Sequence, residues 1–164
     1  MTLALVDGDV IAYLSCKSRY VTEEGHMRVV DKGSHVFSHK ENTQYLMSSY
    51  GHFQNLVEYI SDTLYTTDIL MAVKSEENYR DKVYKDYKAN RKNNTYNSSL
   101  KDIVPELRKI AVFEELAIES TGREADDMLS IWAHQARRSG DPYVIVSIDK
   151  DLKCIPGMYF KPLS

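Results

Sequence analysis

The amino-acid sequence predicts an α/β fold with a mostly parallel central sheet. Three short apolar runs, at residues 3–6, 69–73 and 143–148, lack the polar alternation of a half-exposed strand, which is typical of strands buried on both faces. Segments with the apolar spacing of helices separate these runs, and this alternation favours a parallel sheet covered by helices. The chain has 164 residues, so we expect a single domain over residues 1–164.

The N-terminal half contains two of the predicted strands and two predicted helices. The first strand, at residues 3–6, leads through Asp-Gly-Asp into a helix over residues 10–18. Residues 19–38 mix β-branched residues with Gly25 and Gly33, which favours a small, partly exposed hairpin. Apolar residues then recur at helical spacing over residues 42–65, ahead of the strand at residues 69–73.

The C-terminal half begins with a long segment, residues 75–99, that has no apolar periodicity. Connections of this length within a domain are usually functional or mobile. A helix is predicted over residues 100–116 and a short strand over residues 117–119. Thr121 and Glu124 fit a capping box, with Thr121 as N-cap and Glu124 as the third helical residue, and the helix they open stops at Gly140.

Composition and hydropathy exclude several classes of protein. No apolar run approaches the roughly 18 residues of a membrane span. Asp7 and Asp9 interrupt the apolar N-terminal stretch and no basic residue precedes it, so it is not a signal peptide. Cys16 and Cys154 lie far apart without a C-x-x-C pair, and we interpret both as reduced thiols. These features predict a cytoplasmic protein with no membrane partner.

Charge is distributed unevenly along the chain. The net charge is −3, yet residues 79–92 hold six basic residues against two acidic ones. The remainder holds 15 basic and 22 acidic residues. A basic segment on an acidic body suits a metal-dependent enzyme that acts on a polyanion, whereas the simpler alternative for the segment is a solvated charged loop.

Three acidic clusters follow predicted strands or open a predicted helix. Their members are Asp7 and Asp9, then Glu124, Asp126 and Asp127, then Asp149 and Asp151. The carboxyl ends of parallel strands meet at one crevice, so we expect the clusters to converge there. Crowded carboxylates repel one another unless cations neutralise them, and oxygen-only ligands suit Mg²⁺ or Mn²⁺. Each cluster taken alone also fits ordinary turn or helix N-cap chemistry.

Four motifs, in this order, resemble those of one nuclease family. They are V-D-G-D at residues 6–9, Y-K-A-N-R-K at residues 87–92, G-R-E-A-D-D at residues 122–127 and S-I-D-K-D at residues 147–151. Together they resemble the phage and bacterial 5′–3′ exonuclease / flap endonuclease family, within the PIN-like nucleases, from residue 3 to about residue 156. The resemblance implies a PIN-like three-layer sandwich, with a central mostly parallel sheet flanked by helices and a flexible basic arch.

The resemblance also implies a role for each matching residue. Two divalent ions, Mg²⁺ or Mn²⁺, would be held by six carboxylates: Asp7, Glu124, Asp126, Asp127, Asp149 and Asp151. Nucleic acid would be bound by the basic segment: Arg80, Lys82, Lys85, Tyr87, Lys88, Arg91 and Lys92. Lys88 and Arg91 would act in catalysis with Asp7 and Asp149, the two cations by neutralising the scissile phosphate. Tyr87 would stack on a base.

Two features depart from the family pattern. The strand at residues 69–73 is usually followed by another Asp, and Ser75 stands in that place. Family members also continue into a helix–hairpin–helix region, whereas this chain stops at Ser164. We therefore expect one of three cases: the chain is a fragment, a separate polypeptide supplies that region, or the protein works without it.

The expected function is that of a Mg²⁺-dependent 5′–3′ exonuclease or flap endonuclease of DNA replication, which hydrolyses DNA that has a 5′ end or flap. One alternative is a PIN-type ribonuclease on single-stranded RNA. Another is a catalytically impaired module that binds nucleic acid or a replication partner, which Ser75 and the short chain favour. The expected location is the cytoplasm, or the host cytoplasm if a bacteriophage encodes the chain.

Overall fold

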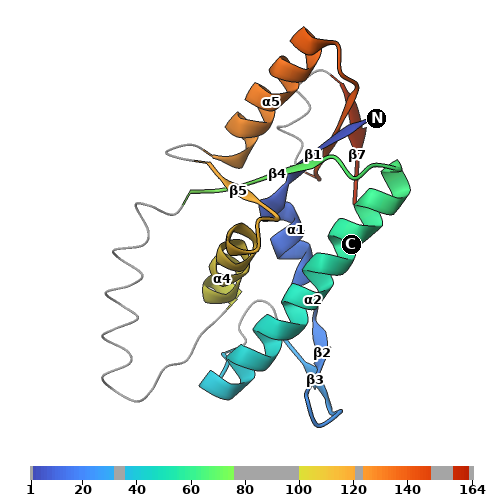
Figure 1. Ribbon diagram of the computed structural model, residues 1–164. Helices are drawn as coiled ribbons and strands as arrows, with labels where there is room; N and C mark the ends of the chain where they lie inside the picture. Colours follow the sequence, from blue (N-terminus) through green and yellow to red (C-terminus); the bar gives the residue numbers. More distant parts are fainter. Residues whose placement is uncertain (1, 32–35, 76–99, 121–123, 149–156, 163–164) are drawn as a thin grey trace.

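The computed structural model describes residues 2–31, 36–75, 100–120, 124–148 and 157–162, and Figure 1 shows the path of the chain. The described elements, in chain order, are β1 (Leu3–Asp7), α1 (Gly8–Ser15), β2 (Arg19–Val21), β3 (Met27–Val29), α2 (His39–Leu64), β4 (Ile69–Val73), α4 (Leu100–Phe113), β5 (Ile118–Glu119), α5 (Ala125–Ser139), β6 (Tyr143–Val146) and β7 (Met158–Phe160). None of these described helices is long and apolar enough to cross a membrane.

Five strands form one sheet in which every described pairing is parallel. Their order is β5-β4-β1-β6-β7, so the first strand of the chain lies at the centre. Ala4 of β1 pairs with Ile69 of β4 on one side and with Val144 of β6 on the other. β2 and β3 form a separate antiparallel hairpin in the predicted place. The predicted α/β class with a mostly parallel sheet is confirmed.

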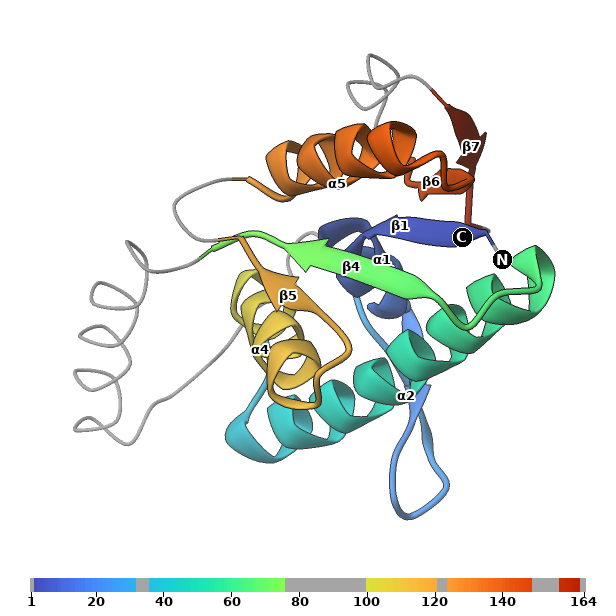
Figure 2. The same ribbon diagram turned by 45° about the horizontal axis from the view of Figure 1, so that its top comes forward.

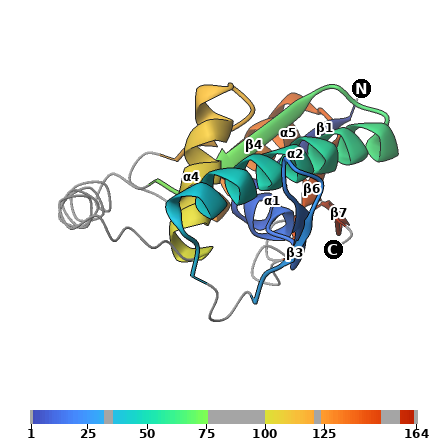
Figure 3. The same cartoon turned by 90° about the horizontal axis from the view of Figure 1, so that it is seen from below.

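Helices cover both faces of this sheet, which produces three layers (Figure 2). Leu5 faces α5 and packs in the same cluster as Leu129. Ala4 and Val6 face the other way, into a core shared with α1, α2 and α4. Figure 3 shows α2 on the outside of this second helical layer, where it packs against α1 and α4. Because β1 is buried on both faces, its first four residues, 3–6, are all apolar instead of alternating.

Three helix starts differ from the sequence predictions. α2 begins at His39, whereas the apolar pattern predicts residue 42. α1 begins at Gly8 and ends at Ser15, whereas the apolar pattern predicts residues 10–18. α5 begins at Ala125, because Glu124 has the extended backbone of an N-cap (φ −79°, ψ 161°). The capping box with Glu124 as the third helical residue is therefore wrong. Gly140 ends α5 as predicted, with a left-handed φ of 74° that glycine adopts without strain.

Candidate active site

The carboxyl ends of four neighbouring strands lie side by side along one end of the sheet, which we call the carboxyl edge. Because β1, β4, β5 and β6 are parallel, this edge is shared by the residues that end or follow them: Asp7, Lys74, Ser120 and Ser147. The backbone N–H of Ser120 donates to the Val73 carbonyl oxygen at 2.9 Å. α5 also starts at the carboxyl edge, where β5 ends (Figure 2). The helix then runs back along the sheet, and β6 begins at the end of the sheet where the amino ends of the strands lie.

Asp7 is a buried carboxylate at the centre of this edge. It is the last residue of β1 and the N-cap of α1, and it is only 6% exposed. The Ser147 hydroxyl, which follows β6, donates to Asp7 Oδ2 at 3.2 Å. Burial raises the pKa of Asp7 to about 6, and the nearby charge of Asp9 acts in the same direction. The Ser147 hydroxyl and the backbone N–H groups of Val10 and Asp9 act in the opposite direction.

Gly8 explains how α1 can begin directly after Asp7. A Cβ on Gly8 would lie 2.6 Å from Val73 Cγ1 and 2.9 Å from the Ala72 carbonyl oxygen, which is closer than such atoms approach. Glycine therefore lets the first turn of α1 contact β4 directly. This contact holds the Asp7 side chain at the carboxyl edge.

Asp9 occupies a different environment, although it belongs to the same motif. Arg108 of α4 contacts Asp9 Oδ1 through Nε at 2.9 Å. The backbone N–H of Lys74, which follows β4, lies 3.1 Å from Oδ1 and 3.2 Å from Oδ2. The two acids of the motif thus have different partners. Asp7 contacts Ser147, and Asp9 joins α1 to the end of β4 and to α4.

The acidic residues of α5 are on the surface at the same edge. Glu124 is the exposed N-cap, Asp126 is half-buried and Asp127 is exposed, both in the first turn. The Asp127 N–H donates to Asp126 Oδ1 at 2.9 Å. The apolar stripe of the helix, which includes Ala125 and Leu129, is buried against the sheet, so α5 begins at the edge with its acidic turn. The three acids thus lie at the carboxyl edge, with Glu124 at the N-cap and not at the third helical position that the capping box predicts.

Other predicted site residues lie outside the described ranges. They are Asp149 and Asp151 among the predicted ligands, and Arg80, Lys82, Lys85, Tyr87, Lys88, Arg91 and Lys92 in the basic segment. Ser147 and Ile148 are the last described residues before Asp149. Ser75 is described, and it lies half-buried two residues beyond β4 at the carboxyl edge.

The chemistry of the described acids fits a divalent cation with oxygen ligands. Within the described ranges, no group of three or more His, Cys, Asp or Glu side chains is arranged to hold a metal ion. Asp7 is nevertheless a carboxylate whose charge is disfavoured by burial, and a nearby cation would relieve this. The donors on Asp7 and at the start of α5 are all carboxylate oxygens, which suit Mg²⁺ or Mn²⁺.

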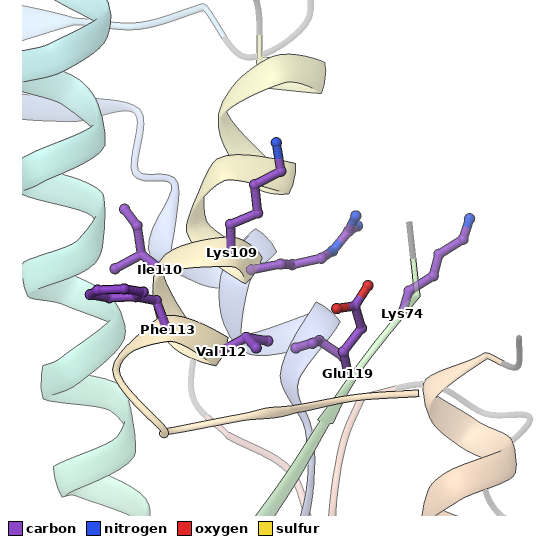
Figure 4. Close-up of a pocket in the computed structure, with 8 residues that line it drawn as sticks. Lys74, Lys109, Ile110, Val112, Phe113 and Glu119 are labelled. Atoms are coloured by element: carbon purple, nitrogen blue, oxygen red, sulfur yellow. The ribbon is translucent and has the colours of Figure 1, made fainter. Parts of the chain in front are cut away.

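A pocket of about 450 Å³ lies between α4 and the ends of β4 and β5 (Figure 4). Ile110, Val112 and Phe113 of α4 line one side, and Lys74 and Glu119 line the strand side. The remaining lining residues are Val73, Arg108 and Lys109. The pocket therefore adjoins the contact between Arg108 and Asp9.

Sequence reasoning missed two contributors to this region. Ser147 stands within the S-I-D-K-D motif, so its place directly after a buried strand is the signal that could have identified it as a partner of Asp7. Arg108 lies in an ordinary amphipathic helix, and no local pattern distinguishes it from Lys109. Its contact with Asp9 depends on how α4 packs against α1.

Comparison with known proteins supports the family resemblance that the sequence motifs indicate. Residues 2–156 match the family described as 5′–3′ exonuclease, N-terminal resolvase-like domain. The chain is also 35% identical over 82 residues to DNA polymerase I of Rhizobium leguminosarum. That match covers 48% of this chain and 8% of the polymerase.

Proposed function

Because the chain belongs to the family of 5′–3′ exonuclease N-terminal, resolvase-like domains, we propose that it is a divalent-metal-dependent nuclease of the 5′–3′ exonuclease or flap endonuclease type. Its substrate is DNA with a 5′ end or flap, and its setting is DNA replication in the cytoplasm. The observation that carries the proposal is the buried Asp7 carboxylate at the edge where the acidic turn of α5 also begins. A sheet edge with buried and exposed acids suits cation-assisted chemistry on a phosphodiester.

The metal ligands in this proposal come from three parts of the chain. Asp7 supplies a ligand from the end of β1, and the other proposed ligands are Glu124, Asp126, Asp127, Asp149 and Asp151. A pair of divalent ions, when bound, supplies charge neutralisation and nucleophile activation for phosphodiester hydrolysis. The Ser147 hydroxyl bonds one oxygen of Asp7 and limits the rotation of its carboxylate.

The basic segment supplies the contacts to the DNA strand in the same proposal. Lys88 and Arg91 neutralise the scissile phosphate, where positive charge stabilises the transition state. Tyr87 stacks on a base, which gives binding without sequence preference. The other cations of the segment contact phosphates along the strand: Arg80, Lys82, Lys85 and Lys92.

Ser75 motivates a second candidate function, that of a nucleic-acid-binding module without cleavage. It stands half-buried just past β4, where the resemblance leads us to expect a further carboxylate. A hydroxyl supplies no negative charge to a cation, so the loss of one ligand would weaken a two-ion centre.

Cleavage and binding of labelled nucleic acids by the full chain, measured side by side, test both candidates. The substrates are 5′-flap DNA, single-stranded DNA and single-stranded RNA, each with Mg²⁺, Mn²⁺ or a chelator. We expect metal-dependent cleavage of the two DNA substrates, lost in Asp7→Asn and in Asp149→Asn. Asp62→Asn, on the exposed surface of α2, is the matched control and should cleave like the wild type. Cleavage of RNA alone would identify a ribonuclease, and binding without cleavage would identify the impaired module.

A further inference from the structure

The carboxylate of Asp9 connects three elements of the fold. Both of its oxygens are engaged: Oδ1 by Arg108 Nε at 2.9 Å, and Oδ1 and Oδ2 by the Lys74 backbone N–H at 3.1 and 3.2 Å. Lys74 directly follows β4, and Arg108 lies in α4. The first turn of α1 is therefore tied to the sheet on one side and to a second helix on the other.

The surroundings of this ion pair make it more than an ordinary surface contact. The Arg108 and Asp9 side chains are 19% and 26% exposed, so solvent screens their attraction less than it screens a fully exposed pair. The guanidinium and the backbone N–H approach the carboxylate from different elements, which fixes its orientation.

The first turn of α1 needs such an anchor. α1 has eight residues, and a helix of this length has little stability of its own in water. Gly8, at its first position, packs its backbone against β4 but has no side chain that could reach α4. Asp9 is the next residue, and its carboxylate supplies that link through Arg108. Asp7 immediately precedes the turn, so any displacement of the turn moves the Asp7 carboxylate.

We propose that Asp9 is a positioning residue, whose contacts with Arg108 and the Lys74 backbone hold the first turn of α1 so that the Asp7 carboxylate keeps its place at the carboxyl edge. This inference rests on the proposed function, because it assigns Asp7 a role in the active site. It distinguishes Asp9 from a further metal ligand. A ligand needs its carboxylate charge at the ion, whereas a positioning residue needs the acceptor oxygens and their partners.

A double-mutant cycle on the full chain separates these two roles. The variants are Asp9→Ala, Asp9→Asn, Arg108→Met and the double variant Asp9→Ala/Arg108→Met. Lys109→Met is the matched control, since Lys109 is the next cation of α4 and its ammonium lies 3.3 Å from Glu106 Oε1. Thermal unfolding without metal identifies a temperature at which every variant is folded, and cleavage of flap DNA and Mn²⁺ affinity by calorimetry are measured at that temperature.

If Asp9 positions Asp7, Asp9→Ala and Arg108→Met each lower kcat about 10- to 100-fold while KM changes less than about threefold. The double variant is no slower than Asp9→Ala, because both changes break one bridge. Asp9→Asn keeps an acceptor oxygen for the Lys74 N–H but loses the ion pair with Arg108, so its kcat falls less than that of Asp9→Ala, and Lys109→Met cleaves like the wild type. Should Arg108→Met fail to fold, Arg108→Lys replaces it, with a smaller loss in the same direction.

Two results would overturn the proposal. One is an Asp9→Asn variant as slow as Asp9→Ala together with an Arg108→Met variant at the wild-type rate, which would make Asp9 a metal ligand. The other is additive losses in the double variant, which would mean independent roles. If the wild type cleaves no DNA, the proposed function fails. Mn²⁺ affinity then tests the bridge without activity: weakening by both Asp9→Ala and Arg108→Met supports it, and weakening by Asp9→Ala alone contradicts it.

Discussion

The end of β1 and the start of α5 place acids at the same sheet edge in opposite ways. Asp7 is 6% exposed, and its carboxylate accepts a hydrogen bond from the Ser147 hydroxyl. Glu124 and Asp127 are exposed to solvent at a helix N-terminus, where negative charge is favourable. Burial raises the pKa of Asp7 to about 6, so its charge is opposed by its surroundings.

The contrast shows how a group of acids can include a carboxylate with a fixed orientation while the fold remains stable. A buried carboxylate is held in one orientation, but it destabilises the fold when it is charged. Surface carboxylates at a helix start cost the fold little, but solvent screens them and their side chains are freer. A site that combines the two has one fixed ligand and several adaptable ones. Substitutions at the end of β1 should therefore have larger effects than substitutions at the start of α5.

Removing the charge of Asp7 is expected to have the largest effect. Asp7→Asn keeps the shape of the side chain, and cleavage should fall by about 10³-fold or more, comparable with the loss of a strong electrostatic contact in a transition state. Thermal unfolding without metal should occur at a higher temperature at neutral pH, because a disfavoured buried charge is removed. Cleavage near the wild-type rate would remove Asp7 from the active site.

The contribution of Asp7 to the stability of the metal-free protein should fall as pH rises between 3.8 and about 6. Asp7 has the higher pKa in the folded state, so the folded protein holds more protons in this range, and its free energy of unfolding decreases as they leave. The part due to Asp7 is about 3 kcal/mol at most, at about 1.4 kcal/mol for each pKa unit. Urea unfolding across this range measures it. Asp7→Asn should lack this part, and an identical pH dependence in the two proteins would contradict the prediction.

Adding a methyl group at Gly8 should destabilise the region around Asp7. In Gly8→Ala the new Cβ would meet Val73 Cγ1 at 2.6 Å and the Ala72 carbonyl oxygen at 2.9 Å. Overpacking of this kind costs about 1–3 kcal/mol of unfolding free energy. The matched control is Gly51→Ala in α2, where nothing lies within 4 Å of the new Cβ and alanine should stabilise the helix by up to about 1 kcal/mol. Urea unfolding of both variants tests the contrast, which fails if they shift stability alike.

Neutralising the acids of α5 should change stability least. Glu124→Gln and Asp126→Asn alter surface or half-buried side chains, so the free energy of unfolding should stay within about 0.5 kcal/mol of the wild type. Mn²⁺ affinity, measured by calorimetry, should still weaken, by less than in Asp7→Asn. Should either change weaken Mn²⁺ binding as much as Asp7→Asn, the two regions would not differ as proposed.

Much of the site could be predicted because its position follows from local patterns. Asp7 follows an apolar run, and Glu124 and Asp126 flank the start of an amphipathic helix, so their place at the carboxyl edge follows from the parallel topology. The start of α5 was misassigned by the capping box, because Glu124 has extended backbone and is itself the N-cap. Cap positions depend on how the preceding chain enters the helix, and residue spacing alone does not report that.

The buried strands and their alternation with helices can be read from the amino-acid sequence, because burial on both faces leaves a continuous apolar run that is visible in a single segment. The family motifs are equally local. The different surroundings of Asp7 and Asp9 follow instead from tertiary packing. The backbone N–H that binds Asp9 lies 65 positions further along the chain, and Arg108 lies further still in α4. Contacts between such distant residues form when the sheet orders its strands and α4 packs against α1, so adjacency in the motif does not predict them.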